Sequence, residues 1–221
     1  MLVKDLMSWP VITVFDNSTV GEALAILRRK NIKHLPVVDN NQALIGVTSE
    51  TDLVKTFPGG RELSSFQSNL LSRTPVSKMM QTNPIFAAPN MIVEQAALVM
   101  RTSRISCLPV LDENSKLIGI LSKNDILDAF IASLGLGEGG TRITIFYKKK
   151  WGFLSELISF ADRHNTCIDN IVSLGQELVL KTKGPSGGFV HDLKKAGYNV
   201  VDVSTIDPPA KIAAGSRTID N

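Results

Sequence analysis

A duplication within the first 131 residues constrains the fold of this chain more than any other feature. Ile32–Asp39 (IKHLPVVD) returns as Ile105–Asp112 (ISCLPVLD), and Leu44–Leu53 returns as Leu117–Ile126, both 73 residues further along. When residues 31–57 are aligned with 104–130 without gaps, 12 of 27 positions are identical. A repeat of about 55 residues buries too little apolar surface to be stable alone. We therefore expect the two copies to pack together.

Each copy shows the same series of expected elements, in the order β-α-β-β-α. An amphipathic helix is expected over 19–30, because Ser18 or Thr19 can cap its start and Glu22 lies in its first turn. The polar turn 39–42 separates two segments rich in β-branched residues, and another helix is expected to begin near Ser49 or Ser122. The remaining expected segments are extended pieces at 10–14 and 84–88, strands at 34–38 and 44–48, and the counterpart helix at 92–102.

Composition excludes several classes of protein. Apolar residues make up 43% of the chain, charged residues 20%, and the net charge is only +3. These values are typical of a globular protein and do not favour nucleic acid as a partner. The chain has no long apolar run, no signal peptide at its start and only two cysteines, so we expect a cytoplasmic protein without a disulfide framework.

A serine and an aspartate recur three residues apart at the start of the last helix of each copy, as Ser49 with Asp52 and Ser122 with Asp125. Three-residue spacing places both side chains on one helical face. A carboxylate can accept hydrogen bonds from both hydroxyls of a ribose, and a helix N-terminus favours a phosphate. The structural alternative is that the serine is only a helix cap and the aspartate only stabilises the helix dipole.

The two copies resemble the CBS-domain family, whose members occur as tandem pairs called Bateman modules. The resemblance rests on the Leu-Pro-Val-x-Asp strand and the Gly-x-x-Ser-x-x-Asp segment of each copy. It implies a regulatory protein that binds AMP, ADP or ATP, or else NAD or S-adenosylmethionine, in clefts between the repeats. The first implied cleft contains Ser49, Asp52, Pro84, Ile85, Phe86, Ile105 and Pro109. The second contains Ser122, Asp125, Pro10, Val11, Ile12, Ile32, Lys33, His34 and Pro36. Lys33, His34 and Lys123 are expected to give this cleft positive charge, with Arg104 as an additional cation.

Beyond residue 140 a different pattern begins. Strands are expected at 141–147, 167–174, 177–182 and 199–203, and helices at 154–164 and 188–196, with Gly197 ending the second helix. The order β-α-β-β-α-β describes a split-βαβ, ferredoxin-like domain. It resembles an ACT domain, and the combination is similar to CBS–ACT regulatory proteins of the acetoin-utilisation type. The turn Lys149–Leu154 keeps the glycine and leucine of an ACT amino-acid site but not its acid and proline, so dimerisation is the expected role.

The fold class predicted is therefore α+β or α/β, with two CBS repeats followed by an ACT-type domain. The predicted parts are repeat 1 (1–57), a linker (58–75), repeat 2 (76–131), a hinge (132–140), the ACT-like domain (141–206) and a flexible tail (207–221). Lys148–Lys150 beside Trp151 are interpreted as a solvated turn rather than a nucleic-acid site.

No catalytic or metal-binding constellation is found in the sequence: His34, His164 and His191 lack metal-ligand spacing, and no nucleophile elbow or P-loop is present. We expect a homodimeric sensor of an adenosine-containing ligand that is not an enzyme and needs no cofactor. The alternatives are a constitutive interaction module with empty clefts and, less favoured, an enzyme of unrecognised type.

Overall fold

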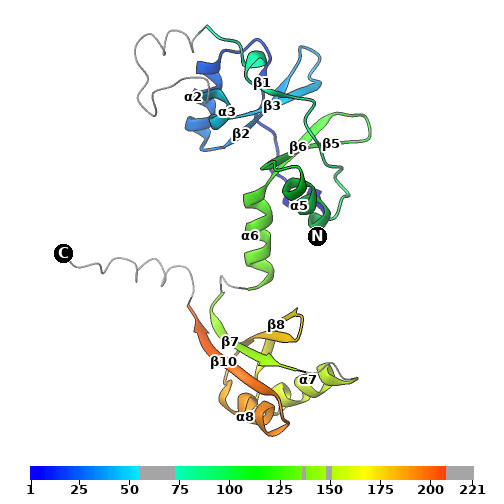
Figure 1. Ribbon diagram of the computed structural model, residues 1–221, viewed down its shortest axis with the longest axis vertical. Helices are drawn as coiled ribbons and strands as arrows, with labels where there is room; N and C mark the ends of the chain where they lie inside the picture. Colours follow the sequence, from blue (N-terminus) through cyan, green and yellow to red (C-terminus); the bar gives the residue numbers. More distant parts are fainter. Residues whose placement is uncertain (55–72, 136–137, 148–150, 208–221) are drawn as a thin grey trace, which may run out of the picture. The chain divides into compact units, whose positions relative to one another are not determined.

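The computed structural model describes residues 1–54, 73–135, 138–147 and 151–207 (Figure 1). Its contacts divide the chain into two compact units, Met1–Leu127 and Asp128–Asn221. Most of the predicted linker, the lysines at 148–150 and nearly all of the predicted tail lie outside the described residues. None of the helices in the described part combines the length and the hydropathy needed to cross a bilayer.

The N-terminal unit contains both sequence repeats. Its first six elements are α1 (Val3–Leu6), β1 (Val14–Phe15), α2 (Val20–Lys30), β2 (His34–Val38), β3 (Leu44–Ser49) and α3 (Glu50–Val54). The next five are η1 (Val76–Lys78), β4 (Gln81–Thr82), α5 (Val93–Thr102), β5 (Cys107–Leu111) and β6 (Leu117–Ser122). Helix α6 (Lys123–Ser133) begins in this unit and continues past its last residue, Leu127. Strands β1 to β4 form one sheet in that order, and β5 pairs with β6.

The helices and hairpins lie where the sequence predicts them, because their signals are local. The Thr19 hydroxyl accepts a hydrogen bond from the Glu22 amide at 3.2 Å, and the Glu22 carboxylate accepts one from the Thr19 amide at 2.8 Å. This reciprocal cap starts α2, and Asn31 ends it in the left-handed conformation with φ 51°. The face of α2 that packs into the core consists of Val20, Ala23, Leu24 and Leu27.

The expected extended pieces are shorter than predicted. Of residues 10–14 only Val14 belongs to a strand, and residues 84–88 form no strand. The backbone there makes a single parallel bridge, from Ala87 to Val110. Prolines at positions 10 and 84 lack the amide proton that a strand ladder requires, which explains why these pieces stay largely unpaired.

The segment at the start of each repeat, residues 1–8 in the first and 74–81 in the second, is called its lead-in here. Each lead-in pairs with the other repeat. Ser8, at the end of the first lead-in, pairs with Ile120 of β6: each amide donates to the other residue's carbonyl, at 2.9 and 3.2 Å. Gln81, exactly 73 residues after Ser8, belongs to β4 and pairs with Val47 of β3. The two lead-ins are therefore exchanged, and the sequence repeats are not separate folding units.

The buried cores show the same exchange. Val3 is fully buried in the core of the second repeat, among residues such as Leu108 and Leu121. Val76 is fully buried in the core of the first repeat, next to residues such as Leu35. A lone repeat would lack one of these buried valines, so the two repeats depend on each other for a complete core.

Two glycines in the sheets make room for the exchanged lead-ins. A Cβ atom added at Gly119 of β6 would lie 2.3 Å from the Met7 sulfur, and one added at Gly46 of β3 would lie 2.5 Å from the Met80 sulfur. Both distances are far below van der Waals contact. Each methionine therefore covers the glycine of the opposite repeat, and any larger residue there would displace it.

The C-terminal unit contains β7 (Gly140–Phe146), α7 (Phe153–Arg163), β8 (Cys167–Leu174), β9 (Glu177–Lys183), α8 (Gly187–Lys195) and β10 (Asn199–Ile206). The sheet order is β10-β7-β9-β8, and every neighbouring pair is antiparallel. This order with two helices is a split-βαβ arrangement. As predicted, α8 ends before Gly197, which has a φ of 86°. The predicted hinge overlaps α6, which continues to Ser133.

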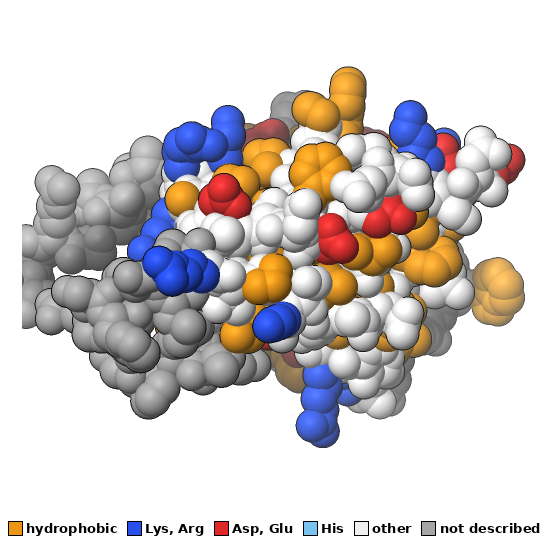
Figure 2. Space-filling model, turned by 90° about the horizontal axis from the view of Figure 1, so that it is seen from above, with side chains coloured by type: hydrophobic (Ala, Val, Ile, Leu, Met, Phe, Trp, Pro, Cys, Tyr) orange, Lys and Arg blue, Asp and Glu red, His pale blue; other side chains and the backbone are white. Residues whose placement is uncertain are grey.

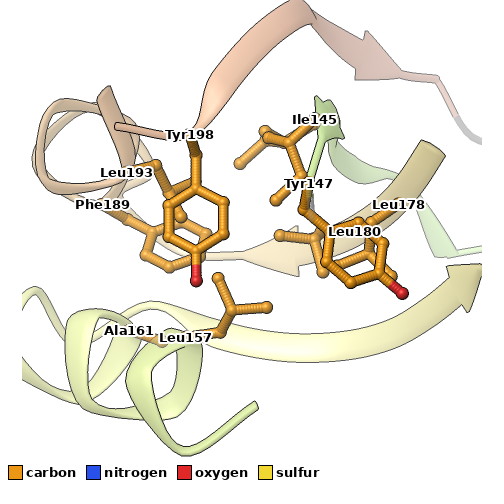
Figure 3. Packing of buried hydrophobic residues seen from close by; sticks show 10 residues of the cluster. Ile145, Tyr147, Leu157, Ala161, Leu178, Leu180, Phe189, Leu193 and Tyr198 are labelled. Carbon is orange, nitrogen blue, oxygen red and sulfur yellow. The ribbon is translucent and has the colours of Figure 1, made fainter. Parts of the chain in front are cut away.

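The core of this unit lies between the two helices and the two central strands of the sheet. Figure 3 shows Leu157 of α7, Phe189 and Leu193 of α8, and Ile145 of β7 facing one another. The Tyr198 hydroxyl lies in the same region and donates to the Glu156 carboxylate at 2.7 Å. Burial and this carboxylate raise the pKa of Tyr198 above its ordinary value.

A charged side chain is also buried in the C-terminal unit. The side chain of Lys181 on β9 is only 4% exposed, and its ammonium group lies 2.7 Å from the Asp169 carboxylate. The same nitrogen donates to the Gly135 carbonyl. The hydrogen bond from Lys181 lowers the pKa of Asp169, because it stabilises the ionised carboxylate.

Candidate ligand-binding cleft between the repeats

The two repeats enclose one open cleft of about 890 Å³ within the N-terminal unit. The residues predicted for the two separate clefts meet in this single space. Of the predicted site residues it is lined by Ser49, Asp52, Pro84, Ile85, Ile105, Pro109, Ser122, Asp125, Pro10, Val11, Ile12, Ile32, Lys33, His34 and Lys123. Phe86 and Pro36 do not line it: Phe86 is 55% exposed, and Pro36 is buried in β2 opposite Val47.

The serine and aspartate of each repeat form a reciprocal helix cap. In the first repeat the Ser49 hydroxyl donates to the Asp52 carboxylate at 2.6 Å, and the Asp52 amide donates to the Ser49 hydroxyl at 3.2 Å. In the second, the Ser122 amide donates to the Asp125 carboxylate at 2.6 Å. The structural alternative considered for these residues is thus realised in both repeats. A carboxylate offers about four acceptor positions, so capping and ligand contact are compatible.

A hydrogen bond crosses the cleft from one repeat to the other. The His34 Nε2 atom, on β2, lies 2.7 Å from the Ser106 hydroxyl, just before β5. Burial lowers the pKa of His34; the Asp52 carboxylate acts in the opposite direction and Lys33 adds to the lowering. His34 therefore favours the neutral form, and it does not supply the positive charge expected of it from the sequence.

Cys107 occupies the position in the second repeat that corresponds to His34 in the first. It lines the cleft but is 7% exposed, and burial together with the nearby Asp52 carboxylate raises its pKa to about 12. The thiol is thus neutral, as is typical of a packing residue. The sequence analysis did not include Ser106 and Cys107 among the site residues, although the 73-residue offset from Lys33 and His34 points to them.

Charge is distributed unevenly along the lining. Lys33, Arg104 and Lys123 bring positive charge, whereas Glu50, Asp52 and Asp125 bring negative charge. From the sequence, Arg104 was expected only to add positive charge to the cleft. Its counterpart Asn31 also lines the cleft, and both residues have left-handed backbones, with φ of 56° and 51°.

Metal binding and nucleic-acid binding find little support in the described ranges. No group of three His, Cys, Asp or Glu side chains there is arranged to hold a metal ion. On the molecular face shown in Figure 2, basic, acidic and hydrophobic side chains are interspersed, and no continuous basic surface is visible. Extended nucleic-acid interfaces need such a surface, so that face does not have the character of one.

Comparison with protein families identifies both repeats. A family model described as "CBS domain" matches residues 3–59 and 76–132. A curated relative, homoserine O-acetyltransferase of Methanococcus vannielii, is 32% identical over 125 residues. That match covers 57% of this chain but only 24% of the relative, so the chain corresponds to a minor part of that enzyme's length.

Solved structures of similar chains cover about three fifths of this chain. The CBS domain pair of protein MJ0100, in complex with 5-methylthioadenosine and S-adenosyl-L-methionine, is 31% identical with a TM-score of 0.51, covering 60% of this chain and 97% of the other. CBSX2 in complex with AMP is 30% identical with a TM-score of 0.50, covering 59% and 96%. AcuB from Vibrio cholerae is 29% identical with a TM-score of 0.52, covering 62% and 96%.

Proposed function

The chain belongs to the CBS-domain family, and from that premise we propose that its tandem pair is a regulatory sensor that binds an adenosine-containing ligand between the repeats. The observation that carries the proposal is the composition of the cleft. A Ser-x-x-Asp cap from each repeat lines the same space as an apolar segment from the other repeat.

The chemistry of this lining suits a nucleoside. Pro10, Val11 and Ile12 on one side, and Pro84 and Ile85 on the other, offer apolar surfaces for a flat base. A backbone carbonyl in such a lining can accept a hydrogen bond from an exocyclic amine. The aspartate carboxylates supply acceptors for a ribose diol.

Similar chains bind ligands of this class. The MJ0100 pair binds 5-methylthioadenosine and S-adenosyl-L-methionine, and CBSX2 binds AMP. These three compounds share the adenosine half, which supports the proposed ligand class. A sensing role further requires that the ligand bind two conformations of the pair with unequal affinity.

The C-terminal unit extends the proposal. We assign its split-βαβ sheet to an ACT-type domain, with predicted bounds 141–206, and we infer that it joins two copies of the chain into a homodimer. Support for the ACT-type assignment comes from the sheet order of this unit. The resulting protein would transmit ligand binding without catalysing a reaction.

The test is a titration of the full chain, followed by isothermal calorimetry, with adenosine, AMP, ADP, ATP, NAD and S-adenosylmethionine. Asp52→Asn and Asp125→Asn are the informative variants, because asparagine keeps one oxygen for the helix cap while removing the charge. Glu113→Gln, exposed and outside the cleft, is the matched control. We expect at least one aspartate variant to lose tenfold or more in affinity.

Two results would contradict the proposal. If no adenosine compound binds the wild-type chain, the pair is an interaction module with empty clefts. If a ligand binds and neither aspartate variant weakens it, the ligand lies elsewhere. Turnover of a nucleotide that is abolished by a cleft substitution would instead support an enzyme.

A further inference from the structure

A second, smaller cavity adjoins the cleft on the side of the second repeat. It has a volume of about 380 Å³ and is lined by Ala97, Met100, Arg101, Arg104, Lys123 and Ile126. Two of these residues, Arg104 and Lys123, also line the main cleft. The two spaces therefore meet at a pair of basic side chains.

The charge of the smaller cavity is of one sign. Three of its six lining residues are basic and none is acidic. Within the described ranges, none of Arg101, Arg104 and Lys123 forms an ion pair with a carboxylate. All three residues are exposed, and the positive potential that they share at this cavity favours a bound anion.

Arg104 is held at this position by an unusual backbone. Its φ of 56° is left-handed, a conformation that costs an ordinary residue roughly 1 kcal/mol and that asparagine tolerates better. The first repeat has Asn31 at the equivalent position. The left-handed residue terminates α5 as Asn31 terminates α2, and this helix end places an arginine where the two cavities meet.

We propose that this basic cavity, formed by Arg101, Arg104 and Lys123, binds the phosphate chain of a ligand whose nucleoside half lies in the cleft. The ligand is then a nucleoside di- or triphosphate rather than a sulfonium compound such as S-adenosylmethionine. Arginine binds phosphate through a planar fork of donors and lysine as a point charge, so together they suit a chain of several phosphate oxygens. A sulfonium centre carries positive charge and would be repelled from the same cavity.

This inference rests on the proposed function, and its test separates the two. The full chain is titrated with adenosine, AMP, ADP, ATP and S-adenosylmethionine by isothermal calorimetry at two salt concentrations. Arg104→Asn introduces the residue of the first repeat and suits the left-handed backbone, and Lys123→Gln removes the second shared charge. Lys116→Gln, exposed in the turn between β5 and β6 and outside both cavities, is the control.

The wild-type chain should bind ADP and ATP at least tenfold more tightly than adenosine, with a preference that declines as salt rises. Each informative variant should lose at least tenfold in ATP affinity relative to its own affinity for adenosine, and Lys116→Gln should behave as wild type. Arg104→Lys should retain part of the ATP affinity.

Different failures have different meanings. If ATP is preferred but the double variant Arg104→Asn/Lys123→Gln binds it unchanged, the phosphates lie elsewhere and the inference is wrong. If S-adenosylmethionine binds more tightly than ATP, the inference is wrong while the proposed sensor function stands. If no adenosine compound binds, both are wrong.

Discussion

The exchange of lead-in segments can be tested at Gly119, because Met7 of the opposite repeat covers it. A methyl group added there would lie 2.3 Å from the Met7 Sδ atom, 2.9 Å from its Cγ and 3.2 Å from its Cβ. Carbon atoms in contact normally stay about 3.5–4.0 Å apart. Gly119→Ala therefore forces the methionine side chain, and with it the lead-in, away from β6.

The expected cost follows from this geometry. Overpacking a filled site destabilises a protein by about 1–3 kcal/mol, and a methionine adapts readily, so we expect about 1–2 kcal/mol for Gly119→Ala. Met7→Ala removes the two atoms that would lie closest, Sδ and Cγ, and leaves only the Cβ at 3.2 Å. In that background the alanine should be neutral or stabilising by about 0.5 kcal/mol, because glycine is a poor strand residue. The two substitutions should therefore show a coupling energy of about 1–2 kcal/mol.

The assay is a double-mutant cycle measured by urea unfolding. The chain has two tryptophans, Trp9 and Trp151, so the Trp151→Phe background leaves Trp9, next to the first lead-in, as the fluorescent probe. A parallel cycle on Gly46 and Met80, where the added carbon would lie 2.5 Å from the sulfur, is the matched comparison. Additivity within about 0.5 kcal/mol in the first cycle would refute the exchange, because distant side chains do not couple.

Three further outcomes follow from the buried polar groups. Burial lowers the pKa of His34, so His34 of the unfolded chain is protonated before that of the folded chain as the pH falls. The wild type should therefore lose more stability than His34→Gln between pH 7 and 5.5, as measured by urea unfolding. Equal losses in the two proteins would contradict this. Burial raises the pKa of Cys107 to about 12, whereas Cys167 is exposed. Iodoacetamide at pH 8 should therefore label Cys167 and leave Cys107 unlabelled until urea is added, as measured by peptide mass spectrometry. Equal labelling of both cysteines in the native protein would be inconsistent with the burial of Cys107. Lys181→Met should destabilise the C-terminal unit by about 1 kcal/mol, because Asp169 loses its nearest cation but is partly exposed and keeps Lys183 at 3.5 Å; no measurable loss in urea unfolding would show that the ion pair contributes nothing.

The features that the sequence predicted correctly are those that depend on residues close together in the chain. The Thr19–Glu22 cap, the hairpin at 34–49 and the end of α8 at Gly197 all agree with the structure. Each depends on residues a few positions apart in the chain. The extended pieces at 10–14 and 84–88 were predicted too long, because their pairing depends on partners from elsewhere in the fold.

The sequence predicted most residues of the candidate site but not their arrangement in space. The duplication and the family resemblance identified the Ser-x-x-Asp pairs, and the structure brings both pairs to one cleft. Sequence reasoning assigned a charge to His34 that its burial opposes, and it gave Arg104 only a secondary place. The burial of His34 and the position of Arg104 between two cavities are properties of the packed chain, so neither could be deduced from residue type alone.

The sequence by itself determined that the chain contains the same repeat twice, which helices and strands each repeat forms, and that the two repeats must pack together. Only the tertiary structure decided which lead-in completes which repeat. Ser8 and Gln81 meet nearly equivalent strands, β6 and β3, so their sequences do not distinguish pairing within a repeat from pairing between repeats. That choice depends on the packing energy gained when Val3 and Val76 are buried in the core of the other repeat. This energy comes from residues far apart in the chain, so it cannot be deduced from the sequence of either lead-in.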